Sequence, residues 1–194
     1  MKITRRSFMK LIPAVAVVVV GGAWWSLAQT ASTTTTVSQA TTGFVFPITW
    51  NGEQPTTINP NDYRLKIDGD LPNPLELKLE ELYAMTGVQK TLPIHCVEEW
   101  GADVPWEGIP LSYLLKKAGS SPESLAHVTI SDITGWYSTT LSSDEAANLE
   151  YMIALKVAGA PLTIDHGYPA RLVAPSHPGY DWVKYVSRIT CASD

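Results

Sequence analysis

The sequence predicts an α+β domain built on mixed or antiparallel sheets. Short segments of alternating apolar and polar residues recur after residue 44, and Gly, Pro and Asp turns separate them. The helical patterns between them are too few and too short for a doubly wound parallel sheet. A hydrophobic content of 45% in 194 residues is enough for one globular domain and too high for a disordered protein.

The first half of the domain is expected to contain strands and helices in turn. Residues 63–67 and 75–79 both alternate, and a turn rich in Asp, Gly and Pro joins them, so these strands should pair. A short helix is expected over 80–85, followed by a strand over 91–96. Pro110 can open a second helix, because the apolar residues between Leu111 and Ala118 share one face.

The second half is expected to contain four more strands and one helix. The strands are predicted over 127–131, 136–141, 170–174 and 183–189. Ser142 and Glu145 have the spacing of a capping box, in which each side chain bonds the other residue's backbone N–H. A helix should therefore start there and run through Leu149.

Residues 1–28 have the pattern of an export signal. Arg5 and Arg6 precede an uncharged apolar run over 11–27, and small residues follow it. The arginine pair with the Ser-Phe-Met-Lys after it resembles the twin-arginine motif, which implies export of a folded protein to the periplasm or another extracytoplasmic space. An ordinary secretory signal or an uncleaved membrane anchor is the alternative. Residues 29–43 read as a Thr/Ser-rich linker, and residues 44–194 as the folded domain.

The charge of the chain argues against nucleic acid as a partner. The whole sequence carries a formal charge of −5, and four of its cations lie in the first ten residues. Residues 29–194 hold 10 Lys and Arg against 19 Asp and Glu, a net charge of −9. A surface this acidic repels phosphate backbones.

Cys96 is the first candidate for chemistry, because it ends the strand expected over 91–96. A thiolate at a strand end could act as a nucleophile or bind a soft metal. A plain disulfide with Cys191 is the alternative, although Cys191 stands in a C-terminal tail that is expected to fray. His95 should point to the opposite face of the strand, as a core or surface histidine.

A second candidate group lies between residues 166 and 184. His166, Arg171 and Lys184 are potential donors to an anionic group, and the loop between them is rich in Gly and Pro. Arginine suits a phosphate, because its planar fork can bind two oxygens. Each of these residues could equally be an ordinary surface charge beside a turn, and the residues alone do not identify a ligand.

The two groups together resemble the molybdopterin domain of the sulfite oxidase superfamily. The resemblance is greatest to its bacterial periplasmic branch, which includes catalytic subunits of protein-methionine-sulfoxide reductases. The matching motifs occur in the family's order and span nearly all of the domain, namely His95–Trp100, Trp106–Leu111, Gly135–Tyr137 and His166–Leu172. A twin-arginine signal fits a protein that folds around a cofactor made in the cytoplasm.

The resemblance implies a molybdenum-molybdopterin cofactor and a role for each matching residue. Cys96 would be the protein thiolate on molybdenum, completing a sulfur-rich site with the dithiolene of the pterin. The residues implied to hold the rest of the cofactor are Asn51 in an N-terminal pterin loop, Ser131 with its hydroxyl, His166 and Arg171 at the pterin and its phosphate, and Trp182, Val183 and Lys184 on the phosphate side.

The resemblance also indicates the reaction and the partners. Sulfite oxidases carry arginine after the ligating Cys, whereas Glu98 and Glu99 stand here and would repel an oxyanion. A two-electron oxygen-atom transfer with a neutral sulfoxide or N-oxide as the small-molecule substrate is therefore expected. The chain has no Cys-x-x-Cys-His haem motif and ends before the family's dimerisation domain, so we expect a monomer with a separate redox partner, a haem membrane protein or cytochrome. The alternatives are a sulfite-oxidising dehydrogenase subunit and a non-catalytic binding domain with a Cys96–Cys191 disulfide.

Overall fold

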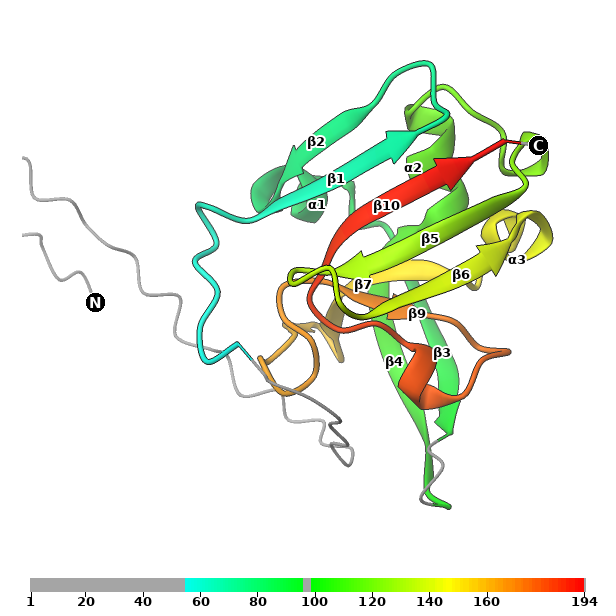
Figure 1. Ribbon diagram of the computed structural model, residues 1–194. Helices are drawn as coiled ribbons and strands as arrows, with labels where there is room; N and C mark the ends of the chain where they lie inside the picture. Colours follow the sequence, from blue (N-terminus) through cyan, green and yellow to red (C-terminus); the bar gives the residue numbers. More distant parts are fainter. Residues whose placement is uncertain (1–54, 96–98, 194) are drawn as a thin grey trace, which may run out of the picture. The chain divides into compact units, whose positions relative to one another are not determined.

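The chain folds into two β-sheets that share one hydrophobic core. The computed structural model describes residues 55–95 and 99–193, and within these residues it contains two five-stranded sheets and three α-helices (Figure 1). The first sheet has the order β2–β1–β10–β5–β6, with bounds β1 Arg64–Gly69, β2 Leu75–Lys78, β5 His127–Asp132, β6 Ser138–Ser142 and β10 Val186–Ala192. The second has the order β3–β4–β7–β8, and β9 also pairs with β7; the bounds are β3 Val88–His95, β4 Gly101–Pro110, β7 Met152–Val157, β8 Ala160–Pro161 and β9 Arg171–Val173.

The pairing confirms the predicted α+β class with mixed sheets. Strands β1 and β10 are parallel, with Lys66 opposite Arg188, and the remaining pairs are antiparallel. The last strand thus inserts between β1 and β5, in the middle of the first sheet. This placement brings the segment before β10, which contains residues 182–185, into the interior.

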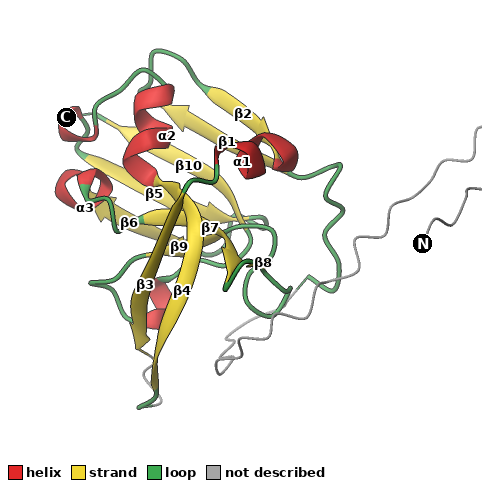
Figure 2. Cartoon of the chain, turned by 180° about the vertical axis from the view of Figure 1, so that it is seen from behind, coloured by secondary structure: helices red, strands yellow, loops and turns green. Residues whose placement is uncertain are grey.

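The helices are short, and two of them cover the same face of the first sheet (Figure 2). They are α1 (Leu79–Met85) and α2 (Leu111–Lys117), while α3 (Ser143–Ala147) follows β6. The predicted capping box at α3 is present, since the Glu145 N–H donates to Ser142 Oγ at 3.3 Å and the Ser142 N–H to Glu145 Oε2 at 2.9 Å. None of the helices in the described residues is long and apolar enough to cross a bilayer.

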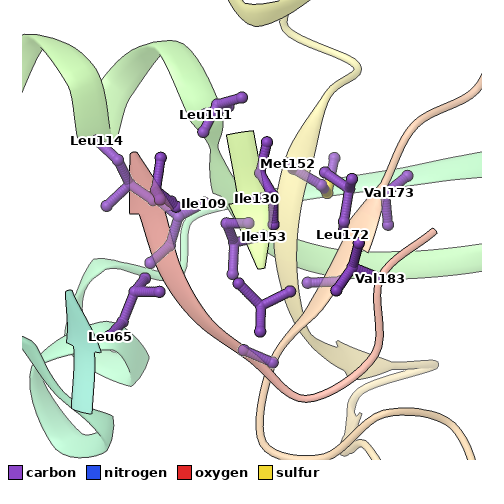
Figure 3. Close-up of a cluster of buried hydrophobic side chains, with 14 of the residues drawn as sticks. Leu65, Ile109, Leu111, Leu114, Ile130, Met152, Ile153, Leu172, Val173 and Val183 are labelled. Atoms are coloured by element: carbon purple, nitrogen blue, oxygen red, sulfur yellow. The ribbon is translucent and has the colours of Figure 1, made fainter. Parts of the chain in front are cut away.

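The core lies between the two sheets and α2 (Figure 3). Side chains from both sheets and from α2 meet there with no exposed surface, among them Leu65, Ile109, Leu114, Ile130 and Ile153. The same core includes Leu172 of β9 and Val183. The segments that carry the candidate cofactor residues are therefore anchored by apolar packing.

The sequence prediction differs from the structure in several elements. Strands β4, β7 and β8 were not predicted; every residue of β7 except Lys156 is buried, so the strand lacks the alternation that marks a half-buried one. The last strand spans Val186–Ala192 rather than 183–189. The expectation of a fraying tail at Cys191 is wrong, because this residue is 2% exposed and pairs with both Gly69 and Val128. Trp136 lies in the turn before β6, not in the strand.

Candidate functional site

Two segments that carry candidate cofactor residues lie side by side at Gly167. The φ of Gly167 is +102°, and a Cβ at this position would lie 3.2 Å from Cα, Cβ and Cγ of Lys184. The Tyr185 N–H also donates to the Gly167 carbonyl at 3.3 Å. Only glycine fits this conformation and this close approach. The structure thus brings together the segments that carry His166 and Lys184.

Arg171 begins β9 and is buried in the middle of this region. It is 4% exposed, and its Nη1 donates to the carbonyl of His166 at 3.2 Å. Its guanidinium lies over the ring of Trp106, with Cζ 5.6 Å from the ring centroid. Burial lowers the pKa of Arg171 to about 10, which still leaves it charged at neutral pH.

Lys184 places a second cation in the same region. It is 8% exposed, and its Nζ donates to the carbonyl of Asp165 at 2.7 Å. Burial, and then repulsion from Arg171, lower the pKa of Lys184 to about 8, although Asp165 acts in the opposite direction. The ammonium is therefore protonated at neutral pH and is easily neutralised above it.

The other predicted residues of this region have mostly structural contacts. His166 is buried, and its Nδ1 lies 2.8 Å from the Thr163 hydroxyl. Trp182 packs against Trp106 with ring centroids 5.8 Å apart, and Val183 accepts a backbone hydrogen bond from Leu172 at 2.9 Å. Val183 is a core residue whose burial fixes the place of Lys184, the next residue in the chain.

A hydrogen-bonded histidine holds the loop that leads to these residues. His177 Nε2 lies 2.7 Å from Glu145 Oε1, its Nδ1 lies 3.4 Å from Asp181 Oδ2, and its carbonyl accepts from Trp182 Nε1 at 3.0 Å. Burial of Glu145 acts to raise its pKa, but hydrogen bonds from Ser142 and His177 outweigh it and lower the pKa to about 2. The charged carboxylate of Glu145 thus ties the loop to α3.

The end of β3 touches the same loop. A Cβ on Gly179 would lie 2.8 Å from the carbonyl oxygen of His95, the last residue of β3. The His95 side chain is exposed, so it is a surface histidine, one of the two positions that the sequence predicted. Cys96 follows His95 directly in the sequence. Cys96, Glu98 and Asn51 lie outside the described residues.

Ser131 lies on the first sheet, where it pairs with other residues than those described above. It is half-buried on β5, where it pairs with Arg188 of β10 and Ser138 of β6. No hydrogen bond in the described part of the chain joins its hydroxyl to Arg171 or Lys184. Its predicted contact with a cofactor stays a prediction.

Sequence reasoning missed the residue that packs between Arg171 and Trp182. Trp106 has no exposed surface on β4 and contacts both side chains. Its motif was recognised as a family marker without a role for the indole. The only sequence signal for this role was a large aromatic residue in the motif. Arg171 and Trp182 come from distant parts of the sequence, so their contacts with Trp106 could not be inferred.

The buried donors fit a cofactor with an anionic phosphate. Arg171 Nε is buried without a hydrogen-bond partner, and no carboxylate of the described residues forms an ion pair with this guanidinium. A buried cation in this state is costly unless an anion neutralises it. Lys184 is a second cation nearby, so it raises the free-energy cost of burying the Arg171 charge and strengthens the attraction for an anion. The described residues contain no cluster of three or more His, Cys, Asp and Glu suited to a metal.

Comparison with known protein families identifies the class of this domain as a molybdopterin-binding domain of oxidoreductases. Residues 51–194 match the family of oxidoreductase molybdopterin-binding domains, and the chain belongs to this family. The membership confirms the resemblance found in the sequence.

Two relatives of the chain share one name. A catalytic subunit MsrP of protein-methionine-sulfoxide reductase from Gluconobacter oxydans is 32% identical over 70% of this chain and 49% of its own length. A Burkholderia mallei subunit of the same name is 27% identical over 69% of this chain and 44% of its own length. The chain therefore spans about half the length of these curated relatives.

One solved structure has a similar fold. The sulfane dehydrogenase SoxCD from Paracoccus pantotrophus aligns with a TM-score of 0.64 and 26% sequence identity, over 71% of this chain and 40% of that chain. The likeness confirms the molybdopterin-binding oxidoreductase fold.

Proposed function

We propose that this chain is the catalytic domain of an exported molybdenum oxidoreductase that reduces a sulfoxide or N-oxide. The observation that carries the proposal is the buried cation pair of Arg171 and Lys184, in which Arg171 Nε has no hydrogen-bond partner among the described residues. The pair supplies the charge that a molybdenum-molybdopterin cofactor requires at its phosphate. The relatives named as protein-methionine-sulfoxide reductases support the substrate class.

The remaining arginines support a neutral substrate. Arg64 donates to the carbonyls of Asn61 and Tyr63, and Arg188 forms an ion pair with Asp68 at 2.8 Å. Both are thus engaged on the first sheet rather than beside Lys184. Without a spare arginine among the described residues, the domain has no clamp for a sulfite-like dianion. The exposed Glu99 adds negative charge near the end of β3.

The chain's own residues bind and orient the cofactor in this proposal. Arg171 and Lys184 would hold the phosphate end, and His166, whose Nδ1 lies 2.8 Å from the Thr163 hydroxyl, would bind the pterin. Cys96 supplies a thiolate to the metal, which when bound provides the two-electron oxygen-atom chemistry. Trp106 lies against both the Arg171 guanidinium and Trp182, and these two buried indoles would shield the cation from water. His177 keeps the loop over 177–182 in place.

The overall reaction needs a separate electron donor. The S=O bond of the sulfoxide breaks, two electrons and two protons are taken up, and a thioether and water form. Reduction therefore requires a second redox protein as electron donor, and we propose a haem membrane protein or a cytochrome. We also propose that the domain acts as a monomer.

The first test is cofactor content followed by turnover. Protein purified from cells that make the cofactor should contain about one molybdenum per chain, and acid oxidation should release a fluorescent pterin. With reduced methyl viologen as electron donor, it should reduce dimethyl sulfoxide or methionine sulfoxide. Protein without molybdenum or pterin would refute the cofactor assignment. Loaded protein that oxidises sulfite with ferricyanide but reduces no sulfoxide would favour the alternative of a sulfite-oxidising subunit.

Export by the twin-arginine route is part of the proposal. Replacing Arg5 and Arg6 with lysine keeps the charge but removes the receptor-read pair, so the variant should stay in the cytoplasm. Cell fractionation and immunoblotting measure the distribution. The single Lys2→Arg variant, which leaves the pair intact, is the control and should be exported normally. Export of the double variant at the normal level would contradict this route.

A further inference from the structure

His177 stands between two carboxylates that belong to different parts of the fold. Its Nε2 lies 2.7 Å from Oε1 of Glu145 on α3, and its Nδ1 lies 3.4 Å from Oδ2 of Asp181, four residues further along the same loop. We call Glu145, His177 and Asp181 the histidine clasp. Each of the three side chains is between 20% and 30% exposed, so the clasp can exchange protons with the solvent.

The Glu145 carboxylate is fixed and charged. Its Oε2 accepts from the N–H and from the hydroxyl of Ser142, both at 2.9 Å, and the Tyr151 hydroxyl donates to Oε1 at 3.1 Å. Since its pKa is about 2, Glu145 stays ionised in neutral and mildly acidic solution. In the described part of the chain, neither Glu145 nor Asp181 forms an ion pair with a lysine or an arginine. The histidine is therefore the cation available to both carboxylates.

Both contacts can be hydrogen bonds only when His177 is protonated. An imidazolium donates from both ring nitrogens, whereas the neutral ring donates from one and has a lone pair on the other. After deprotonation, either Glu145 or Asp181 loses its donor and faces that lone pair. Tyr151, whose ring meets the His177 ring edge-on at a centroid distance of 6.2 Å, stays neutral, because burial raises its pKa. The clasp is thus closed on both sides in acid and on one side after deprotonation.

The clasp lies on the loop that leads into the cofactor residues. The His177 carbonyl accepts from Trp182 Nε1 at 3.0 Å. Trp182 packs against Trp106, whose ring lies against the Arg171 guanidinium, and Lys184 follows Trp182 by two residues. A change in how firmly His177 is held therefore reaches both cations of the candidate site through this loop.

We propose that His177 is a positioning residue whose protonation tightens the loop over 177–182 around the bound cofactor. This inference rests on the proposed function, because it takes the bound group to be a molybdopterin. The hold is strongest in mildly acidic solution, and it weakens within the range of about pH 5 to 8, where imidazoles ordinarily lose their charge. His177 acts through Trp182 and Lys184 rather than through a contact of its own with the cofactor.

The first measurement is the rate of pterin release from the loaded chain at pH 5.5 and pH 7.5. The wild type should release pterin about fivefold faster at pH 7.5, as expected for the loss of one partly exposed charge pair. Lys184, with a pKa of about 8, is mostly protonated at both values. His177→Gln keeps one amide donor toward Glu145 at every pH, so it should release pterin at both values as fast as the wild type does at pH 7.5.

Asp181→Asn is the sharpest variant, because it should abolish the pH dependence without loosening the loop. The amide can accept from the imidazolium Nδ1 or, turned over, donate to Nδ1 of the neutral ring, while Nε2 donates to Glu145 in both states. Release should therefore be equally slow at pH 5.5 and pH 7.5. Persistence of the wild-type pH dependence in Asp181→Asn would overturn the proposal.

Two control variants separate the clasp from other effects of pH and of loop stability. His127→Gln changes an exposed histidine on β5 and should keep the wild-type pH dependence. Thr139→Val removes a hydrogen bond that does not titrate, from Thr139 Oγ1 to the Asp181 carbonyl at 2.6 Å. It should speed release by the same factor at both pH values and leave their ratio unchanged. Loss of the pH dependence in either control would contradict a role for the clasp.

Hydrogen exchange tests the clasp without reference to the cofactor. The amides of residues 177–185 are followed in the full chain as purified, and each rate is divided by the intrinsic chemical rate at that pH. Exchange should rise about fivefold from pH 5.5 to pH 7.5 in the wild type and stay constant in Asp181→Asn. This result in a chain that holds no pterin would support the clasp and refute the proposed function. Exchange that is independent of pH, or pterin release that does not follow it in a loaded chain, would overturn the proposal.

Discussion

Replacement of Cys96 by serine is expected to lower sulfoxide turnover by more than about 100-fold, since even loss of a residue that supports a metal ligand costs 10- to 100-fold. Serine offers a hard and mostly protonated hydroxyl in place of a soft thiolate, and it is a poor ligand for a metal that is already bound by sulfur. The contacts of Arg171 and Lys184 are unchanged, so the pterin should stay bound. The measurements are turnover with dimethyl sulfoxide, pterin content, and the thiolate-to-metal absorption, which should vanish.

Cys191→Ser makes the same chemical change at a residue with a different environment. The Cys191 thiol is buried in β10 and has no disulfide partner among the described residues, and burial, with Asp68 and Asp70 nearby, raises its pKa to about 12. It therefore stays protonated, and its replacement should leave turnover and absorption unchanged. A disulfide with Cys96 instead predicts similar losses of thermal stability in both variants. Equal behaviour of the two variants would refute the role of Cys96 as a ligand of molybdenum.

The sequence predicted those elements whose signal is local. Strands β1 and β2 alternate in polarity, and the start of α3 is set by side chains three residues apart, Ser142 and Glu145. Strand β7 is covered on both faces and reads as a continuous apolar run, which gives no period to detect. Strand β10 is held by its parallel pairing with β1, which comes from the other end of the domain. The C-terminal residues alone therefore could not show that this segment is an ordered strand.

The candidate site was also predictable from the sequence only in part. The motif containing His166 and Arg171, and the later Lys184, pointed to an anion site, and the structure brings these three residues together through Gly167. The contact of Arg171 with Trp106 could not be predicted, because it depends on β4 and β9 both pairing with β7. Trp136 was predicted to lie in a strand. The structure places it instead in a turn that Asp132 orders, and its side chain is exposed there.

Replacement of Arg171 by alanine is expected to lower the cofactor content of the purified chain at least tenfold. The change removes a charge-assisted contact worth about 1.5–3 kcal/mol, and 1.4 kcal/mol corresponds to a factor of ten in affinity. The contact is strong here because Arg171 is 4% exposed and its Nε has no hydrogen-bond partner among the described residues. Molybdenum analysis and pterin fluorescence, at matched purity and at pH 7 where Lys184 is charged, measure the loss.

Two further variants show that the loss comes from the ligand contact rather than from a damaged fold. Arg188→Ala removes an exposed arginine that pairs with Asp68, and it should retain the full cofactor content. Arg171→Met keeps most of the side-chain volume over Trp106 but removes the buried charge. Without cofactor, this variant should melt no lower than the wild type, because a buried cation without a counterion costs stability in the empty domain. Retention of cofactor by both Arg171 variants, or equal loss in Arg188→Ala, would show that Arg171 does not hold the phosphate.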